Sequence, residues 1–267
     1  MNFIQKSAAS IFLCGFIALM AWGCGEQKQD ASSNDALNVE QEIPVLPILE
    51  SDQPAASGSG SVQGTVKFLG EVPTKVEINT SADPVCAAQH TEPLMSEDLL
   101  VGHQQTLQNV FVYVQKGLEG KGFSVPSASA TLDQKGCQYT PHVQGVQVGQ
   151  SLQILNSDST LHNVHGIGAQ NAEFNLGMPI AGMKLNRKFD KPEIMVKMKC
   201  DVHPWMSAYI GVLPHPFFGV TNPEGKFEIK DLPAGSYTLA FWHEKLGEKS
   251  QSINVADGQS VEVNIEF

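Results

Sequence analysis

Short stretches in which apolar and polar residues alternate dominate the chain from Ser61 onward. Residues 62–68 alternate in this way, and residues 110–114 form the continuous apolar run that is typical of a buried strand. Turn-forming residues separate these stretches, and none of them has the spacing of a long amphipathic helix. The pattern therefore predicts an all-β protein.

The stretch at 194–200 shows the alternation most clearly. One set of its side chains is apolar, and the other contains two lysines: Ile194, Val196, Met198 and Cys200 alternate with Met195, Lys197 and Lys199. Since successive side chains of a strand point to opposite faces, the first set is expected to face the core and the lysines to face solvent. Cys200 thus ends a predicted strand with its sulfur on the core side.

A second group of short strands is predicted near the C-terminus, between turns at 222–225, 231–235 and Asp257-Gly258. This part resembles the carboxypeptidase regulatory-like (transthyretin-like) modules. The resemblance rests on Gly225-x-Phe227, Leu232-Pro233-x-Gly235-x-Tyr237 and residues 240–244. Residues 64–70 also resemble the opening strand of such modules, so two sandwiches that share strands remain an alternative to a simple boundary near residue 214.

The N-terminus has the features of an export signal. Lys6 precedes an apolar run at 11–22, which is too short for an ordinary membrane span. The residues Ala21-Trp22-Gly23-Cys24 resemble a bacterial lipobox, and the resemblance implies that Cys24 carries the lipid. An ordinary cleaved signal peptide is the alternative. The polar residues that follow, up to residue 61, are expected to form a flexible tether.

Composition and charge limit the class of protein. Of the 267 residues, 42% are hydrophobic and 17% are charged, which suits a globular chain better than a disordered one. The formal net charge is -11. Because binding to phosphates requires a basic surface, a nucleic-acid partner is not expected.

The motif that carries chemistry is Cys-x-x-His-x-x-Met at Cys200, His203 and Met206. A thiolate, imidazoles and a weak thioether ligand together make up the blue-copper donor set. The second histidine is expected from residues 156–165, which end in His162-Asn163-Val164-His165.

These two segments resemble the cupredoxins, in particular the amicyanin and plastocyanin branch, over residues 105–213. The resemblance implies a Greek-key sandwich that holds one type 1 copper through His162, Cys200, His203 and Met206. Asn163 is then expected to lie just outside the ligands and to orient them. With the other resemblances, it divides the chain into a signal peptide (1–23), a tether (24–61), a cupredoxin-like domain (62–213) and a transthyretin-like sandwich (214–267).

The five cysteines can now be assigned. Cys14 belongs to the signal peptide, Cys24 to the lipid anchor and Cys200 to the metal, so that Cys86 and Cys137 remain. In an oxidising compartment these two are expected to form a disulfide, with two free buried thiols as the alternative. Both cysteines, and the long segment 61–104, are additions to a minimal cupredoxin.

Other readings of the motif are weaker. Zinc rarely uses methionine, a binuclear copper centre needs a second cysteine in the loop, and haem attachment needs Cys-x-x-Cys-His. His165 is expected to be a structural or surface histidine, because residues i and i+3 of a strand point to opposite faces. No motif of a hydrolase or a phosphate-binding loop occurs, so no enzymatic activity is expected.

The expected function is one-electron transfer in the bacterial cell envelope, on the periplasmic side or the cell surface. The electron is expected to pass through a solvent-facing edge of His203. The redox donor and acceptor are not identified, and the membrane is contacted through the lipid anchor. A copper-handling lipoprotein without redox function and a non-redox interaction module of the envelope are the alternatives.

Overall fold

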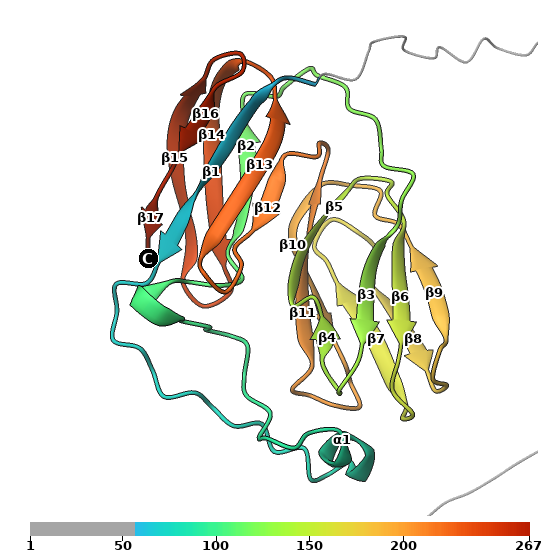
Figure 1. Ribbon diagram of the computed structural model, residues 1–267. Helices are drawn as coiled ribbons and strands as arrows, with labels where there is room; N and C mark the ends of the chain where they lie inside the picture. The colour runs from blue at the N-terminus through green and yellow to red at the C-terminus, as the bar shows by residue number, and fades with distance from the viewer. Residues whose placement is uncertain (1–56) are drawn as a thin grey trace, which may run out of the picture. The chain divides into compact units, whose positions relative to one another are not determined.

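The computed structural model describes residues 57–267, and Figure 1 shows strands β1 to β17 with one short α-helix and one 3-10 turn. The predictions for the signal peptide, for Cys24 and for most of the tether lie outside the described residues. Within residues 57–267, no helix is long and apolar enough to cross a membrane. The predicted all-β fold class is confirmed for this part of the chain.

Residues 130–213 form a first sandwich of two sheets. One sheet has the order β5-β11-β10-β7-β8 and the other has the order β4-β3-β6-β9. Its strands are β3 (Ala130–Gln134), β4 (Tyr139–Thr140), β5 (Val143–Gln147), β6 (Leu152–Asn156), β7 (His162–Ile167), β8 (Phe174–Met178), β9 (Lys184–Arg187), β10 (Glu193–Lys199) and β11 (Ser207–Leu213). A single apolar core lies between the sheets and includes Leu132, Ile154, Val164 and Ile210.

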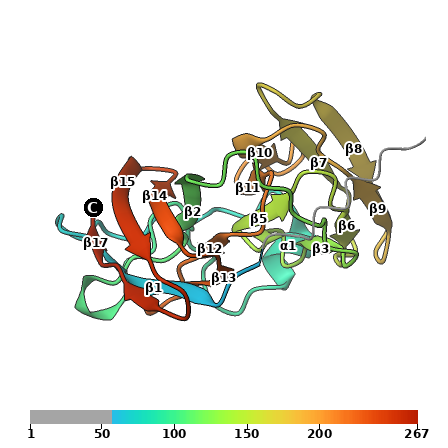
Figure 2. The ribbon, with the colours of Figure 1, turned by 90° about the horizontal axis from the view of Figure 1, so that it is seen from above.

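The remaining strands form a second sandwich, in which one sheet has the order β13-β1-β16 and the other β12-β2-β14-β15, while β17 also pairs with β1. Its strands are β1 (Gly60–Lys67), β2 (Phe111–Lys116), β12 (Phe218–Val220), β13 (Lys226–Leu232), β14 (Gly235–His243), β15 (Gly247–Val255), β16 (Ser260–Glu262) and β17 (Ile265–Glu266). Viewed from above in Figure 2, β14 and β15 lie on one side of this sandwich, and β1 and β13 lie on the other.

The strand pairing differs from the expected division at residue 214. β1 pairs with β13 and β16, and β2 pairs with β12 and β14, so both strands belong to the second sandwich. The range 62–213 expected for the cupredoxin-like domain therefore includes two strands that belong to the other sheets, and β1 already begins at Gly60, inside the expected tether. Alternation of apolar residues indicates a strand but does not specify its partner.

The apolar run of β2 has a structural explanation. Val112 and Val114 point into the core of the second sandwich. Phe111 and Tyr113, on the other face, pack with Val143 and Leu213 of the first sandwich. A strand that is buried on both faces has no polar positions to alternate with, which is why the run is continuous.

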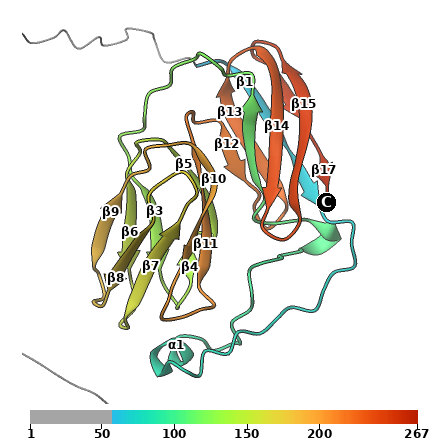
Figure 3. The ribbon, with the colours of Figure 1, turned by 180° about the vertical axis from the view of Figure 1, so that it is seen from behind.

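Residues 68–110 connect β1 to β2 and are called the strap below. The strap carries the short helix α1 (Pro84–Ala88) and a 3-10 turn at His103–Gln105. Figures 1 and 3 show α1 beyond the end of the first sandwich, although α1 is far in sequence from the strands of that sandwich. The predicted disulfide between Cys86 of α1 and Cys137, in the turn between β3 and β4, is confirmed.

Candidate metal centre

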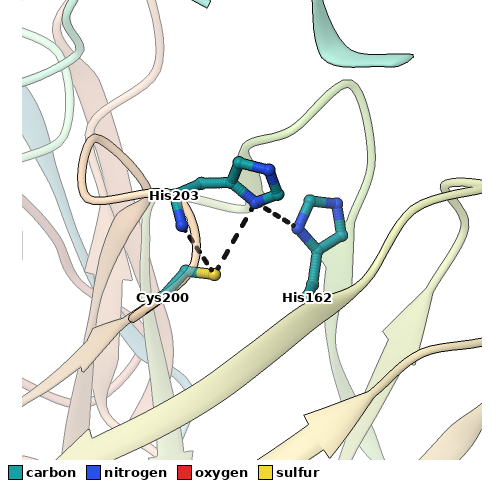
Figure 4. A group of neighbouring side chains, drawn as sticks. All are labelled: His162, Cys200 and His203. Carbon is teal, nitrogen blue, oxygen red and sulfur yellow. Dashed lines mark hydrogen bonds between the residues drawn. The ribbon is translucent and has the colours of Figure 1, made fainter. Parts of the chain in front are cut away.

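Three of the predicted ligands meet at one end of the first sandwich. His162 is the first residue of β7, while Cys200 and His203 lie in the loop that joins β10 to β11. Because β7 and β10 are antiparallel neighbours, the beginning of β7 lies beside the end of β10. Figure 4 shows the two imidazole rings and the sulfur directed toward one another.

The ligand atoms of these three side chains all lie within 4.8 Å of one another. The two Nδ1 atoms of His162 and His203 are 2.9 Å apart, and Cys200 Sγ lies 3.8 Å from His203 Nδ1. The backbone N–H of His203 donates to the same sulfur at 3.3 Å. All three residues are buried, with exposed fractions of 0 to 2%. This arrangement has the size and the donors of a metal site.

Met206 lies at the end of the same loop. Its carbonyl accepts a hydrogen bond from the Cys200 N–H at 3.2 Å, and its own N–H donates to the His203 carbonyl at 2.9 Å. The Met206 side chain is buried in the same core as Cys200. The loop therefore holds Met206 next to the three donors, and its thioether stays a predicted fourth ligand.

Asn163 joins β7 to the ligand loop. Its Oδ1 accepts hydrogen bonds from the Asp201 N–H at 2.7 Å, from the Cys200 thiol at 3.3 Å and from the Val202 N–H at 3.4 Å. Its Nδ2 donates to Asn175 and Asp201. A single amide side chain thus ties the strand that carries His162 to the loop that carries the other donors.

The expected solvent-facing edge of His203 is wrong for this structure. His203 is 2% exposed, and its Nε2 donates to Asp83 Oδ2 at 3.0 Å. Cys86 Sγ lies 3.6 Å from the same nitrogen, and the Trp205 ring centroid lies 5.0 Å from the imidazole centroid. The physical reason is the strap, which lays Asp83 and α1 over the edge of His203 that was expected to face solvent.

The other imidazole also has a carboxylate partner. His162 Nε2 donates to Asp158 Oδ2 at 2.9 Å, and Asp158 is 2% exposed. The backbone N–H groups of Gly136 and Cys137 donate to the two oxygens of Asp158, each at 2.8 Å. Both histidines therefore direct Nδ1 toward the sulfur and Nε2 toward an aspartate.

These contacts shift the pKa values of the groups involved. Burial opposes the ionisation of Asp83, but hydrogen bonds from His203, Thr160 and backbone amides outweigh it and lower its pKa to about 2. The same balance of burial against hydrogen bonds lowers the pKa of Asp158. Burial alone lowers the pKa of His162, yet the hydrogen bonds with Asp158 and Cys200 raise it to about 9.

The pKa of the Cys200 thiol is also set by burial acting against hydrogen bonds. Burial raises its pKa, but the hydrogen bond with His162 and the backbone amides that face the sulfur outweigh burial, so the pKa is lowered overall. The lowered pKa makes the thiolate, which is the form of cysteine that binds metals, more accessible than in a free cysteine.

His165 lies outside this group. Its Nδ1 is 3.0 Å from Asp201 Oδ2 and its Nε2 is 2.5 Å from Glu173 Oε1, so both ring nitrogens are engaged with surface carboxylates. It has the structural role that the alternation of strand positions predicts.

Asp83 and Asp158 were not among the predicted site residues. Asp158 could have been predicted, because it lies four residues before His162 in the segment that resembles the cupredoxins. Asp83 precedes Pro84 at the start of α1, and its carboxylate accepts from the Val85 and Cys86 N–H groups as a helix N-cap. Its contact with His203 spans 120 residues of chain, and no local pattern indicates it.

Comparisons with known proteins give structural neighbours only. No family model and no curated protein matches the chain. Similar solved structures include a copper-containing nitrite reductase from Thermus scotoductus SA-01, with 20% identity over 36% of this chain and 25% of that chain and a TM-score of 0.30. A mutant of amicyanin in its Cu(I) form has 21% identity over 33% of this chain and 86% of that chain, with a TM-score of 0.29. A purple cupredoxin from Nitrosopumilus maritimus has 22% identity over 31% of this chain and 98% of that chain, with a TM-score of 0.27. At this level of similarity the matches assign no family, and the case for the site rests on its geometry.

Proposed function

We propose that the chain binds one copper ion between His162, Cys200 and His203, with Met206 as a weak axial ligand, and that it transfers single electrons. The observation that carries the proposal is the orientation of the two imidazoles. Both Nδ1 atoms point at the sulfur from opposite chain segments, and both Nε2 atoms are hydrogen-bonded to aspartates.

The protonation of the rings follows from these bonds. The lowered pKa values keep Asp83 and Asp158 ionised at neutral pH, and an ionised carboxylate only accepts hydrogen bonds. Each Nε2 therefore carries a hydrogen, and in a neutral ring Nδ1 then has a free lone pair. Two such lone pairs 2.9 Å apart beside the Cys200 sulfur repel one another unless a proton or a metal cation lies between them.

The donor set selects among metals. A thiolate and two imidazoles in one plane with a long axial thioether are the ligands of type 1 copper sites. Zinc accepts the first three donors, but a structural zinc site needs a fourth nitrogen, sulfur or oxygen donor, for which Met206 is a poor substitute. Copper, when bound, supplies a centre that alternates between Cu(II) and Cu(I).

The protein's own residues keep the site from rearranging. His162 is held by a strand of the sheet and by Asp158, and the ligand loop is held by Asn163 and by its own backbone hydrogen bonds. A cage with little freedom suits electron transfer, because the same geometry then has to serve both oxidation states. Burial of all three donors also opposes rapid metal exchange, which counts against a copper-handling role without redox function.

The strap covers His203, but Leu161 and Val202, which precede the ligands His162 and His203 in the chain, are each 45% exposed, and Val85 of α1 is 38% exposed. We propose that electrons cross the surface at these residues to and from redox partners that are not identified. The lipobox-like residues 21–24 support the further proposal that Cys24 anchors the chain in the bacterial envelope. We do not propose a catalytic activity for the chain.

The test uses the purified full chain loaded with Cu(II). We expect one copper per chain, an intense thiolate-to-copper absorption band near the red end of the visible spectrum, and reversible one-electron voltammetry. Cys200→Ser should lose the band, whereas the matched control His165→Gln should keep it because His165 faces surface carboxylates. A wild-type chain that prefers zinc in competition, or binds copper without the band, would refute the proposal.

A further inference from the structure

We propose that Asp83 and Asp158 are positioning residues that fix both imidazoles of the site and hold its reduction potential low. This inference rests on the proposed copper function. It concerns groups outside the ligand set, and each of them contacts one histidine on the side away from the sulfur.

The two carboxylates come from unrelated parts of the chain but accept similar sets of hydrogen bonds. Asp158 lies in the loop between β6 and β7, and Asp83 lies in the strap. Each accepts one imidazole N–H and two backbone N–H groups, at Gly136 and Cys137 for Asp158 and at Val85 and Cys86 for Asp83. The hydroxyl of Thr160 also donates to Asp83. The carboxylates are therefore held in place independently of the histidines.

Fixed acceptors on Nε2 have two effects on the site. They impose the tautomer in which Nδ1 faces the sulfur, and rotation of either ring breaks a charge-assisted hydrogen bond. They also place two negative charges one imidazole away from the metal position. Those charges stabilise Cu(II) more than Cu(I), because the oxidised ion carries one more positive charge.

A simpler role for Asp83 is the N-cap of α1, and the two roles use different oxygens. Oδ1 accepts from Val85 and Cys86, whereas Oδ2 accepts from His203 and Thr160. Asparagine is as good an N-cap as aspartate. Asp83→Asn therefore keeps a capping oxygen at the position of Oδ1 but presents an uncharged donor to His203.

The experiment compares the reduction potentials of the copper-loaded full chain in wild-type, D83N and D98N form. Asp98 is the matched control, since it is a carboxylate on the same strap whose partner is Lys245 and not a ligand histidine. We expect D83N to favour Cu(I) over Cu(II) by at least tenfold relative to wild type, which is a rise of about 59 mV for one electron. D98N should leave the potential unchanged.

A second measurement separates positioning from folding. Long-range proton–nitrogen NMR of the Cu(I) form reports which nitrogen of His203 carries the hydrogen, and we expect Nε2–H in wild type and D98N. If D83N fails to fold, Asp83→Ser retains a capping hydroxyl without the charge and replaces it in both measurements.

The outcomes are distinguishable. A copper-loaded wild type with the charge-transfer band, together with a D83N potential equal to that of D98N, would overturn this inference and leave the proposed function standing. A wild type that binds no copper would remove both. A raised potential in D83N with unchanged helix content supports the inference, because a purely structural cap does not move the potential.

Discussion

Removal of the Cys86–Cys137 disulfide should weaken the fold and open the site together. The bridge closes a loop with a sequence separation of 51, for which the chain-entropy relation gives about 4 kcal/mol of stabilisation. Both cysteines are fully buried. Each also donates its backbone N–H to one of the two carboxylates, Cys86 to Asp83 and Cys137 to Asp158. The disulfide thus joins the two segments whose backbone N–H groups hold Asp83 and Asp158, the carboxylates that contact the two histidines.

The assay is urea unfolding of the metal-free full chain in wild-type and Cys86→Ala/Cys137→Ala form. We expect the free energy of unfolding to fall by about 4 kcal/mol, with an additional loss from the atoms removed. Cys200→Ala is the matched control, because it removes a buried sulfur without changing the cross-link. A chelator should also extract copper faster from the double variant, since His203 is then covered only by noncovalent contacts.

A double variant that loses less than about 1 kcal/mol beyond the control would refute this reasoning. It would mean that the strap stays docked through contacts such as His90 Nε2 with the Gly136 carbonyl at 2.8 Å, and that the cross-link constrains the unfolded chain little. Unchanged chelator kinetics would likewise show that access to the metal does not depend on the bridge.

Three further changes test other parts of the structure. Met206→Leu should retain copper but raise the potential measured by voltammetry, because the axial donor tunes it, and loss of all copper would contradict a weak axial role. Burial lowers the pKa of His243 from 6.5 to about 4, so the neutral ring stabilises the fold above pH 6.5 and that contribution is lost as pH falls toward 4. In urea titrations of the metal-free chain, the free energy of unfolding of wild type should therefore fall by about 2 to 3 kcal/mol more than that of His243→Gln between pH 6.5 and 4. Equal decreases in the two proteins would contradict the assignment. Gly211→Ala would place a methyl group 2.5 Å from the Phe111 ring and should cost about 1 to 3 kcal/mol, as measured by urea unfolding, whereas an unchanged midpoint would show that the ring moves freely.

The sequence predicted best what is encoded within a few neighbouring residues. The alternation that ends at Cys200 placed its side chain on the core side, where the structure has it, and the loop from Cys200 to Met206 is short enough to keep its donors together. The bond between Cys86 and Cys137 followed from elimination once Cys200 was assigned. In each of these cases the number of possible arrangements was small.

What the sequence did not predict depends on partners far along the chain. Residues 60–67 and 111–116 have correct strand patterns, but period two contains no information on which sheet receives the strand. For β1, the resemblance of residues 64–70 to the opening strand of the C-terminal module had offered the pairing as an alternative, and β1 does pair with β13 and β16. Asp83 has a readable helix-cap pattern, yet its contact with His203 depends on the path of the whole strap. The expected solvent edge of His203 was wrong for the same reason, because the segment that covers it lies 120 residues away along the chain.

The second sandwich helps to position the strap over the candidate metal centre. The strap leaves β1 at Lys67 and enters β2 at Phe111, and both strands are built into sheets of the second sandwich. The two ends of the strap are therefore fixed by the second sandwich, while its middle is fixed to the first sandwich by the disulfide. Since Asp83 lies between these attachments, we expect both sandwiches to contribute to its position against His203. A chain that ends at residue 213 would lose the strands that pair with β1, and the disulfide would then be the main attachment of the strap.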